Sequence, residues 1–367
     1  MPIRILHVVT KMDAAGIETL IMNFYRKIDR EKVQFDFLTH RNTKGFYDDE
    51  ILELGGRIFS VSPINPLKHK YYLSELDDFF STHKYFIVHS HINTYSMYIL
   101  RAAEKARVPV RIAHSHIANV PLDFKTPFRI YTKSKLCNYS NFNFACSSMA
   151  GHWLFGKENV SKDNFKIINN SIDASKYRYN NIVEKEVRDE LGLADKFVIS
   201  HIGRFNKQKN HGFIVDIFKE VVKKDPNSVL LLIGEGELET KIREKVINLG
   251  LQDKVMFLGV RSDVNRLLQG TDVFLFPSLY EGLGIVAVEA QAAGLPCVVS
   301  DMVPKEAFIT DLITEIPLSS SAKEWSEVLF RFKGFPKKDT FTLIKDNGYD
   351  IIEQTKKLEE FYLELCT

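Results

Sequence analysis

Disulfide-type cysteine patterns, long apolar runs and low-complexity segments are all missing from this sequence of 367 residues. Its four cysteines, Cys137, Cys146, Cys297 and Cys366, show neither C-x-x-C nor metal-ligand spacing, which predicts reduced thiols in a cytoplasmic protein. The apolar run Ile5–Val9 is too short for a signal-peptide core, and no run approaches the roughly 20 apolar residues of a membrane span. We therefore expect a soluble globular protein that is cytoplasmic and at most peripheral on the inner face of the membrane.

Net charge is also nearly absent, because 49 Lys+Arg face 47 Asp+Glu and leave +2. The division along the chain is uneven. Residues 1–180 hold 25 Lys/Arg and 17 Asp/Glu, a balance of +8, whereas the remainder holds 24 and 30, a balance of −6. This asymmetry predicts two regions with different partners, the basic one suited to an acidic substrate, a nucleic acid or a membrane surface.

Short runs of Val, Ile, Leu and Phe recur along the chain, each followed by a segment with helical spacing. Such continuous apolar strands alternating with helices predict parallel α/β sheets that are buried on both faces. The polar stretch Tyr177–Asp195 separates two series, which predicts two doubly wound domains with ligands at the carboxyl ends of their strands. The expected strands are Ile3–Val9, Val33–Thr39, Arg57–Val61, Tyr85–His89, Val110–His114, Phe142–Ser147 and Phe165–Ile168, then Phe197–His201, Val229–Ile233, Val255–Leu258, Val273–Phe276, Pro296–Ser300 and Leu312–Ile316.

A last helix is expected over Asn347–Leu365, after the second series of strands is complete. The pattern leaves two placements open. The helix either caps its own domain or packs back on the first one.

The segment Phe276–Asp301 carries the strongest chemical pattern. Glycines 282 and 284 follow a strand and precede an Ala-rich helix, so backbone N–H groups and a helix N-terminus can face an anion. Glu281 and Glu289 are spaced so that both can project to one side, where sugar or ribose hydroxyls are natural donors. Two solvated carboxylates, or a glycosidase pair, are the alternative interpretations.

A second pattern is the segment 203–210, directly after the expected strand Phe197–His201. Arg204 and Lys209 can clamp one anionic group, Arg as a fork and Lys as a point charge. Lys207 is interpreted as a surface residue. The turn around Gly16 resembles a phosphate-type turn, but neither it nor the loop 234–237 matches G-x-G-x-x-G, so a nicotinamide enzyme is not supported.

Histidines gather at the ends of two first-domain strands, as the pairs His89/His91 and His114/His116. They suit hydrogen bonding to substrate hydroxyls. A zinc site and, for His89, a purely structural role stay open.

The segment Phe124–Leu136 combines Lys125, Arg129, Lys133 and Lys135 with interleaved aromatic residues. It predicts either a basic amphipathic helix lying on an anionic membrane or a solvated helix whose aromatics face the core. Nucleic-acid binding fits less well, because no nucleic-acid module accompanies the segment.

Several of these motifs together resemble the retaining glycosyltransferases of family 4, a group that includes bacterial capsule and exopolysaccharide transferases. The resemblance runs nearly end to end. The matching motifs are Glu281-x7-Glu289 within EGLGIVAVEA, the following AGLPCVVSD, Gly203-Arg204 with Lys209 for G-R-x4-K, residues 166–173 for I-x-N-G-I-D, and residues 257–259 for F-L-G.

This resemblance implies a GT-B fold, with two Rossmann-like doubly wound parallel-sheet domains facing a central cleft. Residues 1–178 would bind the acceptor, residues 190–345 the nucleotide-sugar, and residues 346–367 would form a helix packing back toward the N-terminal domain. The catalytic set it implies is Arg204, Lys209, Glu281 and His116. The nucleotide-sugar contacts it implies are Gly16, Gly203, Val260, Arg261, Leu283, Gly284, Ile285 and Glu289. His114, an alternative to His116, and His91 are candidates for contact with the acceptor or donor sugar.

The expected activity is transfer of a sugar from a nucleotide-sugar, with UDP as the default, to a saccharide or lipid-linked saccharide acceptor in surface polysaccharide biosynthesis. The anomeric configuration would be retained. No D-x-D occurs, so we expect a metal-independent reaction with no cofactor, the nucleotide-sugar being a substrate. Expected partners also include an anionic membrane but no nucleic acid. An epimerase or hydrolase of the same architecture, or a non-catalytic sugar-binding scaffold, are the alternatives.

Overall fold

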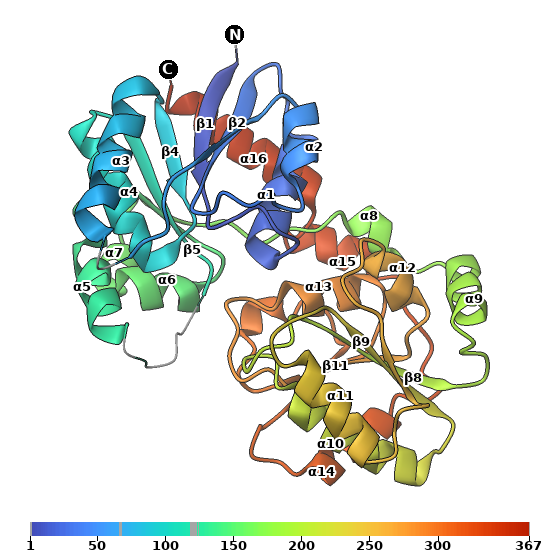
Figure 1. Cartoon of the computed structure of the whole chain (residues 1–367). Helices are drawn as coiled ribbons and strands as arrows, with labels where there is room; N and C mark the ends of the chain where they lie inside the picture. The colour runs from blue at the N-terminus through green and yellow to red at the C-terminus, as the bar shows by residue number, and fades with distance from the viewer. Residues whose placement is uncertain (1, 66–67, 118–122, 124, 367) are drawn as a thin grey trace. The chain divides into compact units, whose positions relative to one another are not determined.

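A computed structural model describes every residue except 1, 66–67, 118–122, 124 and 367. The chain divides into two compact units (Figure 1). Unit 1 comprises residues 1–172 and 350–367, and unit 2 comprises residues 173–349. Within the described residues, no helix is long and apolar enough to cross a membrane.

Unit 1 is built on a parallel sheet of seven strands in the order β3-β2-β1-β4-β5-β6-β7. Strand order reverses between β1 and β4, which is the point where ligands bind in doubly wound sheets. The strands are β1 (Ile3–Val8), β2 (Val33–Thr39), β3 (Arg57–Ser60), β4 (Ile87–Ser90), β5 (Val110–Ser115), β6 (Phe142–Ala145) and β7 (Phe165–Ile167).

Helices cover both faces of this sheet and close two hydrophobic cores. On one face, α1 and the C-terminal α16 pack together, and α16 also lies against β2 (Figure 1). On the other face, α3, α4, α5 and α6 supply the apolar side chains. The helices are α1 (Gly16–Lys27), α2 (Asp48–Glu53), α3 (His69–Thr82), η2 (Asn93–Tyr95), α4 (Ser96–Lys105), α5 (Thr126–Leu136), α6 (Ser148–Phe155), α7 (Lys157–Val160) and α16 (Ile351–Glu364).

The chain passes between the units at two points that are bonded to each other. Ile172 forms a parallel bridge with Asp350, and the N–H of Ile351 donates to the carbonyl of Ile172 at 2.9 Å. Asp350 caps α16, because its carboxylate accepts from the N–H groups of the second and third helical residues. The last helix therefore begins at Ile351, and the predicted start at Asn347 is wrong. The crossings also lie at this bridge rather than at the predicted boundaries of 178, 190 and 345.

Unit 2 repeats the architecture with six parallel strands in the order β10-β9-β8-β11-β12-β13, reversing between β8 and β11. The strands are β8 (Phe197–Ile202), β9 (Ser228–Ile233), β10 (Val255–Phe257), β11 (Val273–Phe276), β12 (Cys297–Ser300) and β13 (Ile313–Ile316). The helices are α8 (Ala174–Tyr177), α9 (Asn181–Glu190), α10 (His211–Lys224), α11 (Glu239–Asn248), α12 (Val264–Gln269), α13 (Ile285–Ala292), η3 (Lys305–Ala307), α14 (Ala322–Phe330) and α15 (Phe341–Asp346).

The predicted fold class is confirmed in both units, since each holds a doubly wound parallel sheet with helices on its faces. Each of the expected strand segments overlaps one strand of the structure, although β4, β5, β8 and β9 extend one residue beyond the expected segment. The strands are almost wholly buried in β1, β2, β8, β9, β11 and β12, as continuous apolar runs require.

Candidate active site

Two glycine-dependent loops lie in contact at the carboxyl ends of the neighbouring strands β8 and β9. A Cβ added at Gly234 would lie 2.3 Å from the carbonyl oxygen of Gly203, and one at Gly236 would lie 2.6 Å from that of Phe205. The N–H of Phe205 also donates to the carbonyl of Glu235 at 2.9 Å. The loop after β8 is therefore held by the loop after β9, and only glycine permits this approach.

The loop after β8 is equally fixed to the loop after β11. The carbonyl of Gln208 accepts from the N–H of Leu279 at 2.8 Å, and its side-chain amide donates to the carbonyl of Tyr280 at 3.0 Å. Asn210, in the left-handed region with φ 57°, donates from its side chain to the carbonyl of Pro277 at 3.1 Å. These bonds place the G-R-x4-K segment beside the E-G-L-G segment.

Lys209 and Glu281 form the central contact between these two segments. The Lys209 Nζ lies 2.6 Å from the Glu281 Oε1 and 4.7 Å from the centre of the Phe276 ring. The Gln208 amide donates to the other carboxylate oxygen at 3.3 Å. The side chain of Glu281 is only 7% exposed, so its charge is balanced by a partly buried ammonium group.

Arg204 lies in the same loop but extends into solvent. Its side chain is 73% exposed, and its Nε lies 3.7 Å from the Glu237 Oε2. The structure therefore pairs the two expected clamp cations with different carboxylates. This exposed pair contributes little to stability.

Gly284 is the N-cap residue of helix α13 and has a left-handed conformation with φ 84°. Its N-terminus has no hydrogen bond from a capping side chain. Leu283 is buried, and Ile285 is the first helical residue. One turn later, the Glu289 Oε1 accepts from the hydroxyl of Tyr177 at 2.8 Å. Burial raises the pKa of Glu289 to about 7, although the hydrogen bond from Tyr177 lowers it. Glu289 thus titrates near neutral pH.

Val260 and Arg261 lie beyond the end of β10, at the surface of unit 2. Val260 is exposed, and the guanidinium of Arg261 donates to both carboxylate oxygens of Asp263 at 2.7 and 2.6 Å. The expected contact of these residues with a nucleobase stays a prediction.

Five buried histidines fill the reversal point of unit 1, where β1, β4 and β5 lie side by side. They form two hydrogen-bonded chains. In the first, the His7 Nδ1 lies 3.0 Å from the His91 Nε2, and the His91 Nδ1 lies 2.9 Å from the His116 Nε2. In the second, the hydroxyl of Tyr362 lies 2.7 Å from the His89 Nδ1, and the His89 Nε2 lies 3.1 Å from the His114 Nδ1.

Burial lowers the pKa of all five imidazoles, to about 3 for His7 and His116 and well below the usual value for His89, His91 and His114. They are neutral at pH 7. Two trios have ligand nitrogens within 4.8 Å of one another, the first being His7, His89 and His91, and the second His91, His114 and His116. These trios are where the described residues offer nitrogen ligands to a metal.

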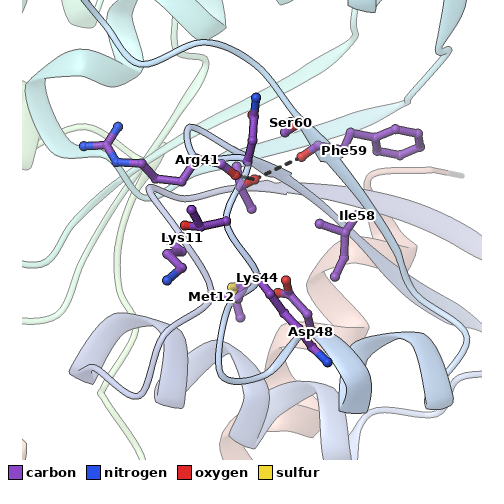
Figure 2. A pocket seen from close by; sticks show the side chains of 11 residues that line it. Lys11, Met12, Arg41, Lys44, Asp48, Ile58, Phe59 and Ser60 are labelled. Atoms are coloured by element: carbon purple, nitrogen blue, oxygen red, sulfur yellow. Dashed lines mark hydrogen bonds between the residues drawn. The ribbon is translucent and has the colours of Figure 1, made fainter.

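The turn at Gly16 has open space, since a Cβ added there would meet nothing within 4 Å. Glu18, in the first turn of α1, has its pKa raised to about 7 by burial. A pocket of ≈ 230 Å³ lies nearby, at the carboxyl ends of β1, β2 and β3. Figure 2 shows Lys11, Arg41 and Lys44 around it, with residues 58–60 of β3 as another part of the lining.

The basic helix α5 follows neither expectation completely. Phe128 packs into the core, whereas Ile130 and Tyr131 are exposed. Arg129 pairs with Asp123, and the Lys133 Nζ lies 5.1 Å from the centre of the Trp153 ring. Phe124 lies outside the described residues.

Four features of these sites were missed by sequence reasoning. Gln208 braces Glu281, Tyr177 bonds Glu289, His7 extends the histidine chain, and Arg41 lines the pocket. A histidine inside the first apolar strand was a visible signal for His7. The others depend on contacts between segments far apart in the chain, which spacing does not reveal.

Comparisons with known proteins agree with this architecture. Residues 14–176 match the family model for Glycosyltransferase Family 4, and residues 183–320 match that for Glycosyl transferases group 1. EpsF of Bacillus subtilis (strain 168), assigned by its name to the glycosyltransferases, is 35% identical over 372 residues, covering 98% of this chain and 96% of that protein. The UDP-Gal:alpha-D-GlcNAc-diphosphoundecaprenol alpha-1,3-galactosyltransferase of Escherichia coli is 28% identical over 210 residues, 54% of each chain.

Among solved structures, Anabaena Alr3699/HepE in complex with UDP-glucose superposes with a TM-score of 0.80 at 19% identity. The match covers 98% of this chain and 99% of that one, which shows that the fold is shared. The shared fold alone does not assign a family, whereas the 35% identity to EpsF along nearly the whole chain does. The chain belongs to glycosyltransferase family 4.

Proposed function

We propose that the protein transfers a sugar from a UDP-sugar to a saccharide or lipid-linked saccharide acceptor in surface polysaccharide biosynthesis, with retention of configuration and without a metal. The observation that carries this proposal is the Lys209–Glu281 pair at the reversal point of unit 2, with Arg204 exposed in the same loop. Unit 2 would bind the donor, and unit 1 the acceptor.

Cleavage of the sugar–phosphate bond places negative charge on the departing diphosphate. Arg204 and Lys209 would stabilise this charge, together with backbone N–H groups around Gly284 at the start of α13. Glu281 would hold Lys209 in position and accept hydrogen bonds from the donor sugar. Glu289 would accept from the ribose hydroxyls.

Glu18 and Glu289 have a pKa raised to about 7, but Glu289 is assigned here to the ribose and Glu18 lies in the first turn of α1. We assign the proton of the acceptor hydroxyl to an oxygen of the departing phosphate. His116, with His114 and His91 nearby, would hydrogen-bond the transferred sugar. With a pKa of about 3, its imidazole is too weak a base to take the proton of the acceptor hydroxyl.

The pocket of unit 1 supports an acceptor that carries phosphate. Lys11, Arg41 and Lys44 line it together with polar and apolar groups, and guanidinium and ammonium groups suit phosphate oxygens. The Escherichia coli relative named above has a diphosphoundecaprenol-linked acceptor in its name. Arg41→Ala should raise KM for such an acceptor and leave KM for UDP-glucose unchanged, whereas equal changes in both would contradict the assignment.

A peripheral membrane contact through α5 fits an acceptor of this kind. Ile130 is 63% exposed, and Tyr131 and Lys135 are also at the surface. Sedimentation with vesicles should increase with their content of anionic lipid and fall in high salt. Ile130→Asp should weaken this binding, and a wild-type protein that ignores lipid charge would contradict it.

The test of the donor site compares two cations in one loop. Arg204→Ala should lower the rate of sugar transfer about 10²-fold or more, because a preorganised electrostatic contact is lost. Lys207→Ala removes an exposed cation nearby and should leave the rate near that of the wild type. Transfer would be measured with UDP-glucose and related donors on a panel of lipid-linked saccharides.

Product analysis without an acceptor separates transfer from the other reactions of this architecture. A transferase releases little UDP in the absence of the acceptor, whereas an epimerase or hydrolase turns over without one. Near-wild-type transfer by both Arg204→Ala and Glu281→Ala would overturn the proposed function.

A further inference from the structure

The histidines of unit 1 leave specific nitrogens unpaired. Among the described residues, the His7 Nε2, the His114 Nε2 and the His116 Nδ1 are buried and have no hydrogen-bond partner. His91, in contrast, uses both ring nitrogens, because it contacts His7 on one side and His116 on the other. The first chain therefore begins and ends at an unpaired nitrogen.

A neutral imidazole carries one N–H donor and one acceptor nitrogen. In a chain of three, choosing the donor of one ring fixes the other two. Either His7, His91 and His116 all carry their proton on Nδ1, or all carry it on Nε2. The first arrangement leaves a lone pair of His7 unpaired inside the unit and an N–H of His116 at the other end. The second arrangement reverses this.

Both end nitrogens are buried, so their position along the strands distinguishes the two arrangements. An unpaired buried N–H group is rarer, and more costly, than an under-used acceptor. His7 lies within β1, with its ring centre 4.1 Å from that of Phe35, whereas His116 is the first residue after β5, at the carboxyl end of the sheet where a ligand can supply an acceptor. The N–H of the His116 backbone is also fixed, since it donates to the Asn93 side chain at 3.1 Å.

We propose that His91 is a positioning residue that holds His116 in the Nδ1-protonated form, so that His116 presents a fixed N–H donor to an oxygen of the bound sugar. The contact between His116 and sugar rests on the proposed function, whereas the tautomer does not. The second chain is separate, because its contacts join Tyr362 to His89 and His89 to His114, and none of them involves His91 or His116.

A shared metal would require a different arrangement of the same rings. The His91 and His116 nitrogens lie 2.9 Å apart, a hydrogen-bond distance. Two nitrogens bound to one tetrahedral zinc at roughly 2.0–2.1 Å would lie about 3.3 Å apart. Metal binding would also take away a nitrogen that His91 now uses in its hydrogen bonds.

The test is nitrogen-15 NMR of the full chain with labelled histidine at pH 7.5, where the two tautomers give distinct ring-nitrogen signals. The His116 signals are identified as those lost in His116→Gln. In the wild type they should report a protonated Nδ1. His91→Leu should release His116 to the Nε2-protonated or an averaged form. Tyr362→Phe, the matched control in the second chain, should leave His116 unchanged.

The same variants are then assayed for sugar transfer. His91→Leu should lower kcat/KM about tenfold, the loss of one neutral hydrogen bond, while Tyr362→Phe stays near the wild type. A wild-type His116 protonated on Nε2, or stoichiometric zinc in the purified protein, would overturn the proposal. The wild-type spectrum decides the tautomer even where His91→Leu does not fold. The expected spectra without any sugar transfer would instead contradict the proposed function.

Discussion

The two units share one sheet topology but differ in the charge of the side chains that lie where the strand order reverses. Both sheets reverse strand order once, between β1 and β4 in unit 1 and between β8 and β11 in unit 2. At this point unit 1 has five neutral histidines bonded to one another, whereas unit 2 has the charged pair Lys209–Glu281 between two loops. One architecture therefore supports a neutral polar site and an ionic one.

The difference follows from where the polar groups lie along the strands. In unit 1 the histidines begin within the strands themselves, at His7, His89 and His114, so they are buried and their charged forms are disfavoured. In unit 2 the charged residues follow the strands in loops, where Lys209 and Glu281 are largely buried and each balances the charge of the other. A neutral site suits hydroxyl groups, and an ionic site suits a diphosphate.

Loss of the C-terminal helix should produce the largest difference in stability between the two units. Removing residues 350–367 uncovers Ile351, Leu358, Phe361 and Tyr362, which are buried in the core of unit 1. At about 1.5–3 kcal/mol for each side chain, the loss approaches the whole stability of a domain. Hydrogen exchange should show unit 1 unprotected and unit 2 protected. Ile352→Ala, at an exposed position of the same helix, is the control, and equal protection in both units would contradict the prediction.

Acid should unfold unit 1 before unit 2. Lowered pKa values mean that the unfolded chain binds more protons below pH 6.5, so stability is lost as pH falls from 6.5 toward the folded pKa. The slope is about 1.4 kcal/mol per pH unit for each histidine. The affected residues are His7, His40, His89, His91, His114 and His116 in unit 1, and His201 and His211 in unit 2.

Peptide-resolved hydrogen exchange between pH 7 and pH 5 would check this order. Glu18 in unit 1 and Glu289 in unit 2 both have a pKa raised to about 7. Their protonation stabilises the folded state as pH falls, by a similar amount in each unit, so the histidines decide the difference. Earlier loss of protection in unit 2 would show that the histidine chains do not control acid stability.

Breaking the ion pair should destabilise unit 2 by a smaller amount. Lys209→Ala leaves the buried Glu281 carboxylate without its cation, at a cost of about 3 kcal/mol. The double change Lys209→Ala with Glu281→Gln should recover most of this loss, because no buried charge is left. Chemical denaturation followed in unit 2 measures both, and a double variant no more stable than the single one would argue against a buried ion pair.

The smallest expected effect is a change in the affinity for the donor as the pH is varied. Glu289 accepts hydrogen bonds more strongly when ionised, so affinity for UDP-glucose should rise several-fold as pH increases through about 7. Tyr177→Phe removes a bond that lowers this pKa and should move the midpoint upward. Calorimetry would measure both, and intact UDP-glucose is preferable because the terminal phosphate of free UDP titrates near pH 6.

Glu289→Gln is the matched control for this titration. Its affinity for UDP-glucose should not change with pH over the same range. A pH dependence that persists in Glu289→Gln would assign the titration to another group.

Much of the fold was predictable because its signals are local. Continuous apolar runs identified the strands of both sheets, and the spacing of Glu281, Glu289, Arg204 and Lys209 pointed to the loops that we propose as the donor site. The start of the last helix was predicted less well. Three residues expected to be helical, 347–349, precede Asp350, whose side chain caps α16 and whose backbone pairs with Ile172.

By itself, the sequence determined the α/β class, the two-domain organisation, the family motifs and the division of charge between the two parts of the chain. These depend on periodicity and composition, which are properties of neighbouring residues. Only the tertiary structure decided that Lys209 pairs with Glu281 while Arg204 stays in solvent, and that His7 joins His91 and His116. Those contacts connect segments far apart in sequence, so they exist only once the strands are ordered in the sheet and the loops have closed on one another.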